Sequence, residues 1–341
     1  MDMTYPELLG YMKKSLEKGD YHASALMREV VGKGNPRFWE AKAFEESRLL
    51  TSRLKEEVCF YPGEVVRQME EEGVRKFLTR LSDGAHIESV VIPMMGYATL
   101  CLSTQVGCRM GCRFCRTAEM GLERNLTPSE IVGQLWNARF TLGASIRNLV
   151  FMGMGEPLDN LDAVVRSIKV MTDIRGFSIG PRRITVSTVG LCDKMVALAE
   201  ARLGVRLALS LNASEQKVRA SLMPAGSAND LSRLKETLLH LKEHPGLRPG
   251  VMLEYVLLKG VNDSDGDVER LASFAQGLSA TFNVIPWHAS EGDASFCAPD
   301  DEAVNAFHEK MRAKGLSVRR RWSQGKGLLA ACGQLGAEEK G

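Results

Sequence analysis

The alternation of strand-like and helical segments after residue 98 is the feature that most limits the fold of this chain. Apolar runs rich in β-branched residues recur six times, and segments with helical periodicity separate them. The strand-like runs are Thr99–Val106, Asn148–Met154, Arg183–Val189, Val205–Asn212, Val251–Leu258 and Thr281–Trp287. The first helix starts at Thr127-Pro128-Ser129-Glu130, a capping box with proline in the first turn, and later ones cover Leu161–Thr172, Asp193–Ala201, Asp230–Glu243 and Asp265–Leu278.

Repeated strand–helix units imply an α/β fold with parallel strands and right-handed crossovers. A six-unit open barrel and a doubly wound sheet both satisfy this pattern. In either fold, ligands bind at the carboxyl ends of the strands. A helix at Asp301–Lys314 and a strand at Leu316–Trp322 complete the pattern.

The chain before the alternation has a different character. Its first ~70 residues have mainly helical patterns. Two strand-like runs, Val74–Leu81 and His86–Pro93, then flank Asp83-Gly84, a dipeptide that favours a type I′ hairpin turn. We therefore expect a helical accessory domain over residues 1–70, a β-hairpin extension over 71–97, an α/β core over 98–290 and a C-terminal helix, strand and loop over 291–341.

Composition narrows the class of protein. A net charge of +2 over 341 residues gives no sign of a polyanionic partner, although it permits a local basic groove. Eight cysteines without an apolar signal segment at the N-terminus indicate reduced thiols in a cytoplasmic protein, not a secreted disulfide scaffold. No apolar run reaches the ~18 residues that cross a bilayer, so we expect no membrane association.

Three cysteines lie directly after the first strand of the core, in the order Cys108-x3-Cys112-x2-Cys115. Three thiolates in eight residues can hold three irons of a [4Fe–4S] cluster and leave the fourth iron open to a chelating ligand. This spacing is typical of radical S-adenosylmethionine (SAM) enzymes. A zinc site is the alternative, but structural zinc sites usually consist of two separated pairs, and no second C-x2-C is present.

Other polar residues at strand ends are candidates for binding SAM. Gly155 and Glu156 close the second strand, where glycine permits close approach and the carboxylate can accept a hydrogen bond. Ser187 ends the third strand, Ser210, Leu211 and Asn212 end the fourth, and His288 follows the sixth. A tight turn with a solvated glutamate and ordinary strand-end caps are the structural alternatives.

Two further cysteines and one glutamate have open interpretations. Cys332 has small neighbours that favour an accessible thiol, yet free cysteines are often simply buried. Cys101 lies on the opposite face of its strand from Leu100 and Leu102. Glu88 has apolar neighbours, so it is either an outward-facing strand residue or a carboxylate with a raised pKa that is useful as a base.

These motifs together resemble the RlmN/Cfr family of radical SAM RNA methyltransferases. The resemblance extends from about Asp83 to Gly336 and includes Gly153-Met154-Gly155-Glu156-Pro157, Arg182-Arg183-Ile184-Thr185-Val186-Ser187-Thr188 and Ala330-Ala331-Cys332-Gly333-Gln334. It implies a partial (β/α)6 barrel, a [4Fe–4S] cluster on Cys108, Cys112 and Cys115, and two SAM molecules per turnover. It also implies methylation of an adenine in rRNA, tRNA or both at an sp2 carbon, C2 or alternatively C8.

The resemblance also implies roles for the remaining candidates. Cys332 would carry the methyl group as S-methylcysteine, and Cys101 would release the product through a transient disulfide with Cys332. Glu88 would accept the proton of the adenine ring. Gly155, Glu156, Ser187, Ser210, Leu211, Asn212 and His288 would contact SAM. A flavodoxin or ferredoxin would supply electrons to a monomeric enzyme.

Some positions depart from the family pattern. The family usually has histidine where this chain has Asn212 and asparagine where it has His288, so we hypothesise that these two residues have exchanged roles in one SAM contact. A run at Arg319-Arg320-Arg321 and the arginines beside the cysteines, Arg109, Arg113 and Arg116, are predicted to flank the site and contact RNA, with a solvated charged face as the alternative. Rival functions are a different radical SAM reaction that abstracts hydrogen from a protein or small molecule, and a non-catalytic RNA-binding or iron–sulfur sensor protein.

Overall fold

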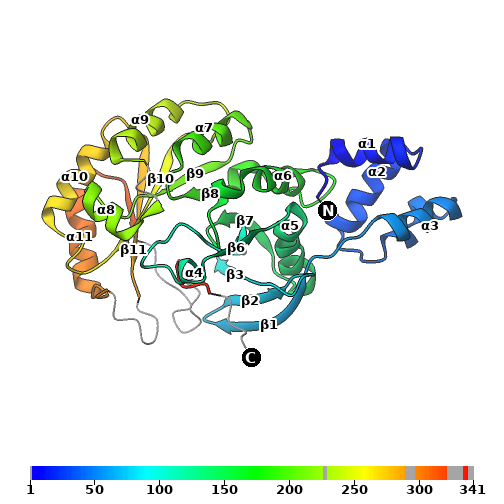
Figure 1. The fold of residues 1–341 in the computed structure, drawn as a ribbon, viewed down its shortest axis with the longest axis horizontal. Coiled ribbons are helices and arrows are strands. Elements are labelled where there is room, and N and C mark those ends of the chain that lie inside the picture. The colour runs from blue at the N-terminus through cyan, green and yellow to red at the C-terminus, as the bar shows by residue number, and fades with distance from the viewer. Residues whose placement is uncertain (1, 226–228, 289–295, 321–332, 337–341) are drawn as a thin grey trace.

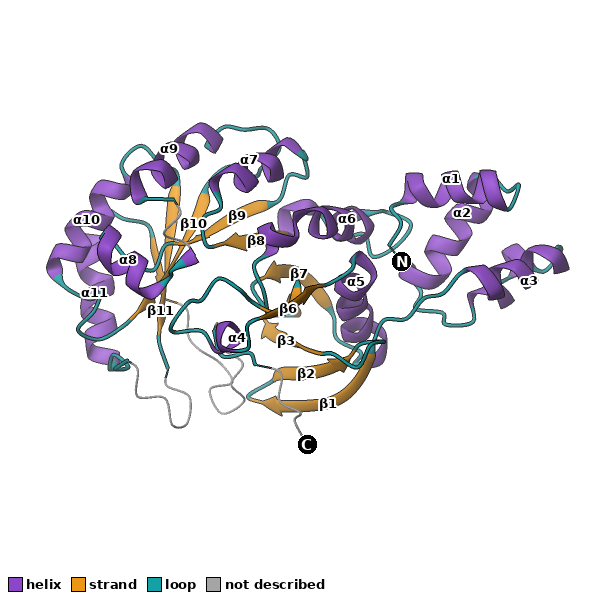
Figure 2. Ribbon diagram, in the orientation of Figure 1, coloured by secondary structure: helices purple, strands orange, loops and turns teal. Residues whose placement is uncertain are grey.

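A curved sheet with helices along its outer side forms the body of the molecule (Figures 1 and 2). The computed structural model describes residues 2–225, 229–288, 296–320 and 333–336. Ten strands pair in the order β1-β2-β3-β4-β7-β8-β9-β10-β11-β12, and β5 and β6 form a separate pair. From β4 onward every neighbour in the large sheet is parallel, whereas β1 to β4 pair antiparallel.

The parallel strands follow one another in sequence order, which decides between the two folds that the alternation permits. A doubly wound sheet reverses its order at a switch point. Here β4 to β12 run in order without a reversal, so right-handed crossovers place the helices on one face and the sheet curls into an open barrel. The strands are β4 (Tyr97–Cys101), β7 (Ile146–Phe151), β8 (Ile184–Thr188), β9 (Arg206–Ser210), β10 (Val251–Leu257), β11 (Ala280–Pro286) and β12 (Val318–Arg320).

The connecting helices carry apolar stripes that pack on the sheet. Helix α6, for example, buries Val164, Ile168 and Met171, which are spaced three or four residues apart. The helices are α5 (Pro128–Trp136), α6 (Leu161–Thr172), α7 (Cys192–Glu200), α8 (Gln216–Leu222), α9 (Leu231–Leu241), α10 (Asp265–Ala275) and α11 (Asp301–Ala313). The predicted strand–helix units are thus confirmed, and the short helix α8 is an addition to them.

The first predicted core strand is wrong in extent. Strand β4 ends at Cys101, and the chain bends before β5 (Gln105–Gly107), which pairs with β6 (Leu122–Asn125). The bend is stabilised by Gln134, whose side chain accepts from Ser103 N and donates to Ser103 O. A local apolar run cannot reveal this break, because a buried glutamine more than thirty residues away produces it.

Before the barrel lie helices and an antiparallel meander. Helices α1 (Tyr5–Ser15), α2 (Asp20–Met27) and α3 (Arg48–Glu57) form a lobe beside the barrel in Figure 1. Strands β1 (Glu64–Glu71), β2 (Val74–Arg80) and β3 (His86–Met94) follow. Strand β1 corrects the expectation of a helical segment that continues to residue 70. It is an edge strand with little alternation in burial, and pairing with β2 stabilises it.

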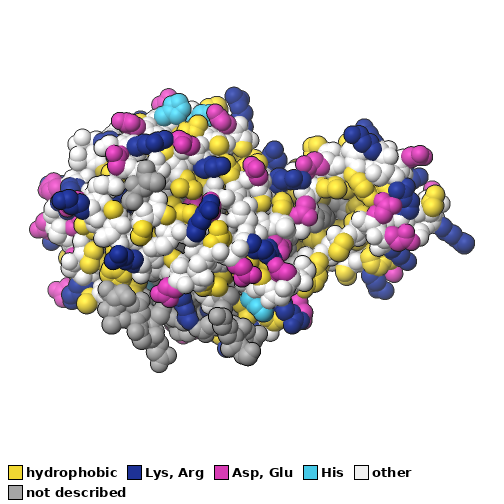
Figure 3. Space-filling view, in the orientation of Figure 1, with side chains coloured by type: hydrophobic (Ala, Val, Ile, Leu, Met, Phe, Trp, Pro, Cys, Tyr) yellow, Lys and Arg dark blue, Asp and Glu magenta, His cyan; other side chains and the backbone are white. Residues whose placement is uncertain are grey.

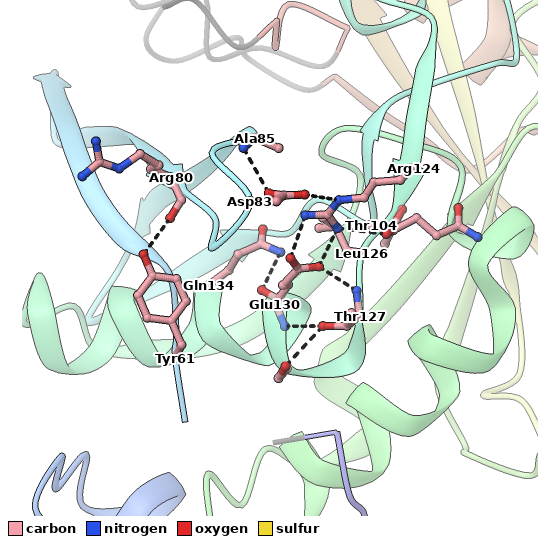
Figure 4. Close-up of polar contacts among 12 residues, drawn as sticks. Tyr61, Arg80, Asp83, Ala85, Thr104, Arg124, Leu126, Thr127, Glu130 and Gln134 are labelled. Carbon is pink, nitrogen blue, oxygen red and sulfur yellow. Dashed lines mark hydrogen bonds and ion pairs between the residues drawn. The ribbon is translucent and has the colours of Figure 1, made fainter. Parts of the chain in front are cut away.

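The hairpin between β2 and β3 is confirmed, but its turn is not type I′. That turn requires positive φ at both central residues, and only Gly84 has it, at +88°. The loop is longer, with Gly84 N donating to Leu81 O at 3.0 Å and Leu81 N to Ala85 O at 2.8 Å. Asp83 is instead held by Arg124, whose Nε lies 2.7 Å from Asp83 Oδ2 (Figure 4).

Arg124 of β6 ties three elements together. Its Nη1 and Nη2 donate to the two oxygens of Glu130 at 2.9 and 2.8 Å, and its Nε reaches the hairpin loop. Glu130 also completes the predicted capping box with Thr127, which the structure confirms (Figure 4). The bidentate pair fixes β6, and hence its partner β5, against α5. Strand β5 leads directly into Cys108, so this network positions the cysteine loop.

Candidate active site

The three motif cysteines line one cavity at the carboxyl ends of the barrel strands, as predicted. We call this the thiol cavity. Besides Cys108, Cys112 and Cys115, its described lining includes Met110, Phe114, Thr117, Phe151, Met152, Gly153, Gly155, Glu156, Pro157, Ser187, Val189, Ser210, Asn212, Met223, Glu254, Val256, Ile285, Gly333 and Leu335. Thus Gly155, Glu156, Ser187, Ser210 and Asn212 of the predicted SAM contacts meet the cysteines in a single cavity.

Backbone contacts hold the cysteine loop. Gly107 has φ +73°, and a Cβ there would lie 1.8 Å from Gly121 O, so only glycine fits the start of the loop. Cys108 N donates to Gly121 O at 2.8 Å, and Cys115 N donates to Cys112 O at 3.1 Å. The loop is therefore anchored where it leaves β5 and folded back on itself between the second and third cysteine.

The raised pKa values of the cavity thiols favour a positively charged ligand. Burial and the neighbouring Cys115 raise the pKa of Cys108 to about 12, and burial is also the main cause of the raised pKa of Cys112. Buried thiols of this kind become thiolates only with cationic compensation, which iron provides. No group of three or more His, Cys, Asp or Glu within the described ranges is arranged to hold a single metal ion. Three thiols that line one cavity at this spacing fit the three-cysteine ligation of a [4Fe–4S] cluster.

Arg219 lies beside the cysteines and was not identified from the sequence. It is fully buried on α8, and its Nη2 donates to Val189 O at 2.5 Å. Burial lowers its pKa to about 10, while the charge of Cys112 acts in the opposite direction. A single arginine in a short amphipathic helix usually indicates a solvated residue, so only the packing reveals this one.

Part of the Gly153-to-Pro157 turn packs against neighbouring chain segments. A Cβ on Gly155 would lie 2.6 Å from the Gln105 side chain, and one on Gly153 would lie 2.7 Å from the Leu102 backbone. The Glu156 carboxylate accepts from Val189 N at 2.9 Å and from Leu158 N at 3.0 Å. Burial raises its pKa to about 7. The glycines thus permit close approach of chain segments, and Glu156 presents a backbone-anchored carboxyl group to the cavity.

The fourth-strand residues differ in their accessibility. Asn212 has φ +56°, a left-handed conformation that asparagine tolerates, and its Oδ1 accepts from Val256 N at 3.0 Å. Leu211 is fully buried and outside the described lining of the cavity. His288 follows β11 but is likewise not among the described lining residues. The hypothesis of an exchange between Asn212 and His288 therefore stays a prediction.

Two of the three residues that the resemblance assigns to group transfer are described, and both are buried on strands. Cys101 is buried at the end of β4 and shares its face of the strand with Thr99. Glu88 is buried on β3, with Oε1 2.8 Å from Lys76 Nζ. Cys332 lies outside the described residues, and the chain is described again from Gly333. The roles of all three stay predictions.

The segment that directly follows Cys332 is attached to the site at three points. Arg116 N, next to Cys115, donates to Gly333 O at 2.8 Å. Thr117 Oγ1 donates to Leu335 O at 2.5 Å, and Gly336 N donates to Glu88 Oε2 at 2.7 Å. The predicted methyl carrier is therefore joined in sequence to a segment that contacts both the cysteine loop and the predicted base.

The arginines near the C-terminus do not flank the thiol cavity, contrary to prediction. Arg319 and Arg320 belong to β12 and line a different cavity, near the amino ends of the strands, because β12 pairs with the middle of β11. Arg321 lies outside the described residues. Of the arginines beside the cysteines, Arg109 is exposed and forms an ion pair with Asp159. No described helix has both the length and the apolar character to cross a membrane.

Comparison with known proteins gives consistent matches. A family model described as the radical SAM superfamily matches residues 102–273. A relative from Syntrophus aciditrophicus (strain SB), named dual-specificity RNA methyltransferase RlmN, is 39% identical over 341 residues, which cover 98% of this chain and 95% of the relative. A relative of the same name from Desulfosudis oleivorans is 44% identical over 277 residues, which cover 80% of this chain and 73% of the relative.

A solved structure shows the same architecture. The crystal structure of a radical SAM methyltransferase from Sphaerobacter thermophilus superposes with a TM-score of 0.90 at 35% sequence identity. The match covers 98% of this chain and 97% of the other, so it includes the N-terminal lobe as well as the barrel.

Proposed function

Because the chain belongs to the RlmN family of radical SAM RNA methyltransferases, we propose that it methylates an sp2 carbon of an adenine in rRNA or tRNA, C2 rather than C8. The observation that carries the proposal is a contact between the thiol cavity and the segment that follows Cys332. The three-thiol cavity and the segment after Cys332 meet through the hydrogen bond from Arg116 N to Gly333 O. A radical SAM enzyme of another class has no need of a cysteine directly before this segment in the sequence.

The cofactors of this family are a [4Fe–4S] cluster and SAM, and Cys108, Cys112 and Cys115 would hold the cluster. When bound, the cluster would supply the electron for reductive cleavage of SAM. The chain's own residues orient the SAM molecule. Glu156 presents its carboxyl group to the SAM ammonium, and Ser187 and Ser210 present hydroxyl groups from adjacent strands. Asn212, Gly155, Leu211 and His288 complete the proposed contacts.

The same chain supplies the groups for methyl transfer. Cys332 holds the methyl carbon as a thioether. The Cys101 thiolate attacks the Cys332 sulfur, which forms the disulfide and breaks the sulfur–carbon bond, and the released carbon takes up a proton and remains on the adenine as its methyl group. Glu88 accepts the ring proton. Its carboxylate is held in position by Lys76 Nζ at 2.8 Å and by Gly336 N at 2.7 Å, four residues beyond Cys332. Lys76 also compensates its negative charge in a buried site.

Further features of the proposal concern partners and compartment. RNA is the substrate, a flavodoxin or ferredoxin donates electrons, and the enzyme acts as a monomer in the cytoplasm. The ligand role of Cys108, Cys112 and Cys115 and the carrier role of Cys332 all require reduced thiols. A reducing compartment maintains cysteines in that form, which supports the cytoplasmic location.

The test uses two cysteine variants in cells that lack the native enzyme. Nucleosides from rRNA and tRNA are compared by mass spectrometry for 2-methyladenosine and 8-methyladenosine. We expect Cys332→Ala to lose both the product and the extra methyl mass on the Cys332 peptide, while the iron content is retained. Cys101→Ala should accumulate a covalent protein–RNA adduct that the double variant lacks. Full methylation in both single variants would refute methyl transfer through Cys332 and Cys101.

A further inference from the structure

A second cavity lies near the amino ends of the barrel strands, and arginine dominates its lining. We call it the arginine cavity. Its volume is about 1050 Å³. The residues that define it are Arg182, Arg183, Arg202, Arg206, Arg248, Arg319 and Arg320. Five of them come from loops or strands at the starts of β8, β9 and β10, and two come from β12.

Both cavities belong to the concave face of the same sheet. Thr185 lines the arginine cavity and Ser187, two residues later, lines the thiol cavity. The same relation holds for Met252 and Glu254 on β10. Because residues two apart on a strand share a face, the cavities are the two ends of one barrel interior. Asn283 and Glu254 form a floor between them, with Asn283 Nδ2 donating to Glu254 Oε1 at 2.8 Å.

The positive charge in the arginine cavity is not balanced by acidic side chains. Its described lining contains no Asp or Glu. Arg320 is paired with Asp301, but the other six arginines form no ion pair with any acidic residue that the structure describes. Elsewhere the charges are mixed, and Figure 3 shows basic and acidic side chains interspersed over one face of the molecule. The net charge of +2 therefore does not explain why positive charge is concentrated in the arginine cavity.

Several of these guanidinium groups are held in place. Arg248 Nη1 donates to Arg182 O at 2.9 Å, and Arg183 Nη1 donates to Asn148 Oδ1 at 3.3 Å. Arg206 is partly buried, and burial together with the charges of Arg248 and Arg319 lowers its pKa. Like charges thus converge on Arg206 without a described counter-charge, and an anion in the cavity would relieve their repulsion.

We propose that the arginine cavity binds backbone phosphates of the RNA substrate as a second contact, remote from the thiol cavity. This inference rests on the proposed function for the identity of the ligand. Arginine forms bidentate contacts to phosphate, and six guanidinium groups around a cavity of this volume exceed what a single phosphate uses. Arg182, Arg202 and Arg319 are exposed at the cavity, where a folded RNA can reach them. Met94 in the lining and the 97% exposed Met95 add apolar contacts suited to bases and not to a small phosphate ion.

The first test compares two variants with equal loss of charge. In one, Arg182, Arg202 and Arg319 are replaced by Ala. In the control, the exposed Lys169 on α6, Lys194 on α7 and Lys242 directly after α9 are replaced by Ala. Binding of bulk tRNA to the full-length protein is measured as a function of salt. Each phosphate that the protein no longer neutralises should reduce the slope of log K against log salt by roughly 0.7 to 1, so we expect a reduction of about 2 to 3 in the arginine variant only. Equal slopes in the two variants would overturn the proposal.

The second test locates the contact and identifies its source. The wild-type protein is treated with phenylglyoxal, which modifies accessible arginines, and peptides are analysed by mass spectrometry. Bulk tRNA should protect Arg182, Arg202 and Arg319 and leave Arg233, on the outer helix α9, reactive. Inorganic pyrophosphate at the same phosphate concentration should not protect them. Equal protection by pyrophosphate would assign the cavity to a small phosphate ligand and contradict an RNA contact.

Failure of this inference is distinct from failure of the proposed function. Both tests measure binding and need neither the cluster nor methyl transfer. If RNA protects the arginines but no methylated product forms, the second contact stands and only the proposed reaction is refuted. If methylation is normal but RNA does not protect the arginines, the second contact is refuted and the proposed reaction stands.

Discussion

The two ends of the barrel interior are built on the same strands but offer opposite chemistry. At the carboxyl ends, thiols, hydroxyls and the buried carboxyl groups of Glu156 and Glu254 surround a cavity with much apolar lining. At the amino ends, cationic groups converge without acidic partners among the described lining residues. The side chains alternate with a period of two, so one face carries both sets only a few residues apart. This fold thus separates a site for covalent chemistry from a site for electrostatic binding.

The difference also concerns how each end is stabilised. The thiol cavity depends on backbone contacts from distant segments, namely the bonds to Gly121, Gly333 and Leu222. The arginine cavity is formed mainly by residues that begin strands or precede them. A change at the carboxyl end is therefore expected to alter chemistry, and a change at the amino end is expected to alter affinity.

The largest expected effect is on SAM cleavage, which should depend on the thiol cavity and not on the arginine cavity. Cys108→Ala removes a proposed iron ligand, so the anaerobically reconstituted protein should lose its iron and its cleavage of SAM should fall to background. The Arg182/Arg202/Arg319→Ala variant should keep both, because those residues do not line the thiol cavity. Iron content and the yield of 5′-deoxyadenosine without RNA provide the measurement. A matched control is Cys59→Ala, which removes an exposed thiol.

Intact SAM cleavage in Cys108→Ala would refute the ligand assignment. Loss of cleavage in the arginine variant would refute the separation of the two ends.

The carboxyl end was largely predictable from sequence, and the amino end was not. Cys108, Cys112 and Cys115 are recognisable by their spacing, and Glu156 and Ser187 by their place after apolar runs. The arginines are dispersed in sequence, from Arg182 to Arg320, and the fold alone brings them together. For the same reason no sequence pattern identifies Arg219. The break after Cys101 depends on Gln134, which no local pattern connects to it.

The second prediction concerns pH and the carboxyl end alone. Burial raises the pKa of Glu156 to about 7, above the usual 4.5. Its protonated form is favoured in the folded protein, so its contribution to stability is complete below about pH 4.5 and is lost as the pH rises through about 7. Relative to Glu156→Gln, the apo wild-type protein should lose roughly 3 kcal/mol of unfolding free energy across this window. The arginine cavity should add no such dependence, since arginine stays charged.

Urea unfolding at several pH values on both sides of this window checks the sign. The Gln variant has a constant offset, because its amide group replaces one oxygen that accepts from a backbone N–H. Parallel stability curves for the two proteins would mean that folding does not raise the pKa of Glu156.

The third prediction tests the floor between the two cavities. Asn283→Ala removes the donor to Glu254 Oε1, and both residues are buried. Losing a hydrogen bond to a buried carboxylate should cost about 2 kcal/mol of unfolding free energy. Asn305→Ala is the control, because this exposed asparagine on α11 accepts a bond from Arg320 at the surface, and its loss should cost under about 0.5 kcal/mol. Equal costs for the two changes would show that the floor is not a stabilising element.

The smallest effect concerns the attachment of the C-terminal segment, which has no counterpart at the amino end. Thr117→Val removes the hydroxyl that donates to Leu335 O at 2.5 Å but keeps the shape of the side chain. A neutral hydrogen bond is worth about 1 kcal/mol, so positioning of the Cys332 segment should weaken by roughly fivefold. We expect the rate of Cys332 methylation to fall by about that factor, with SAM cleavage unchanged, and Thr117→Ser to restore it. Because Thr117 also lines the thiol cavity, a Val variant that slows SAM cleavage and Cys332 methylation equally would instead assign the hydroxyl to the cavity itself.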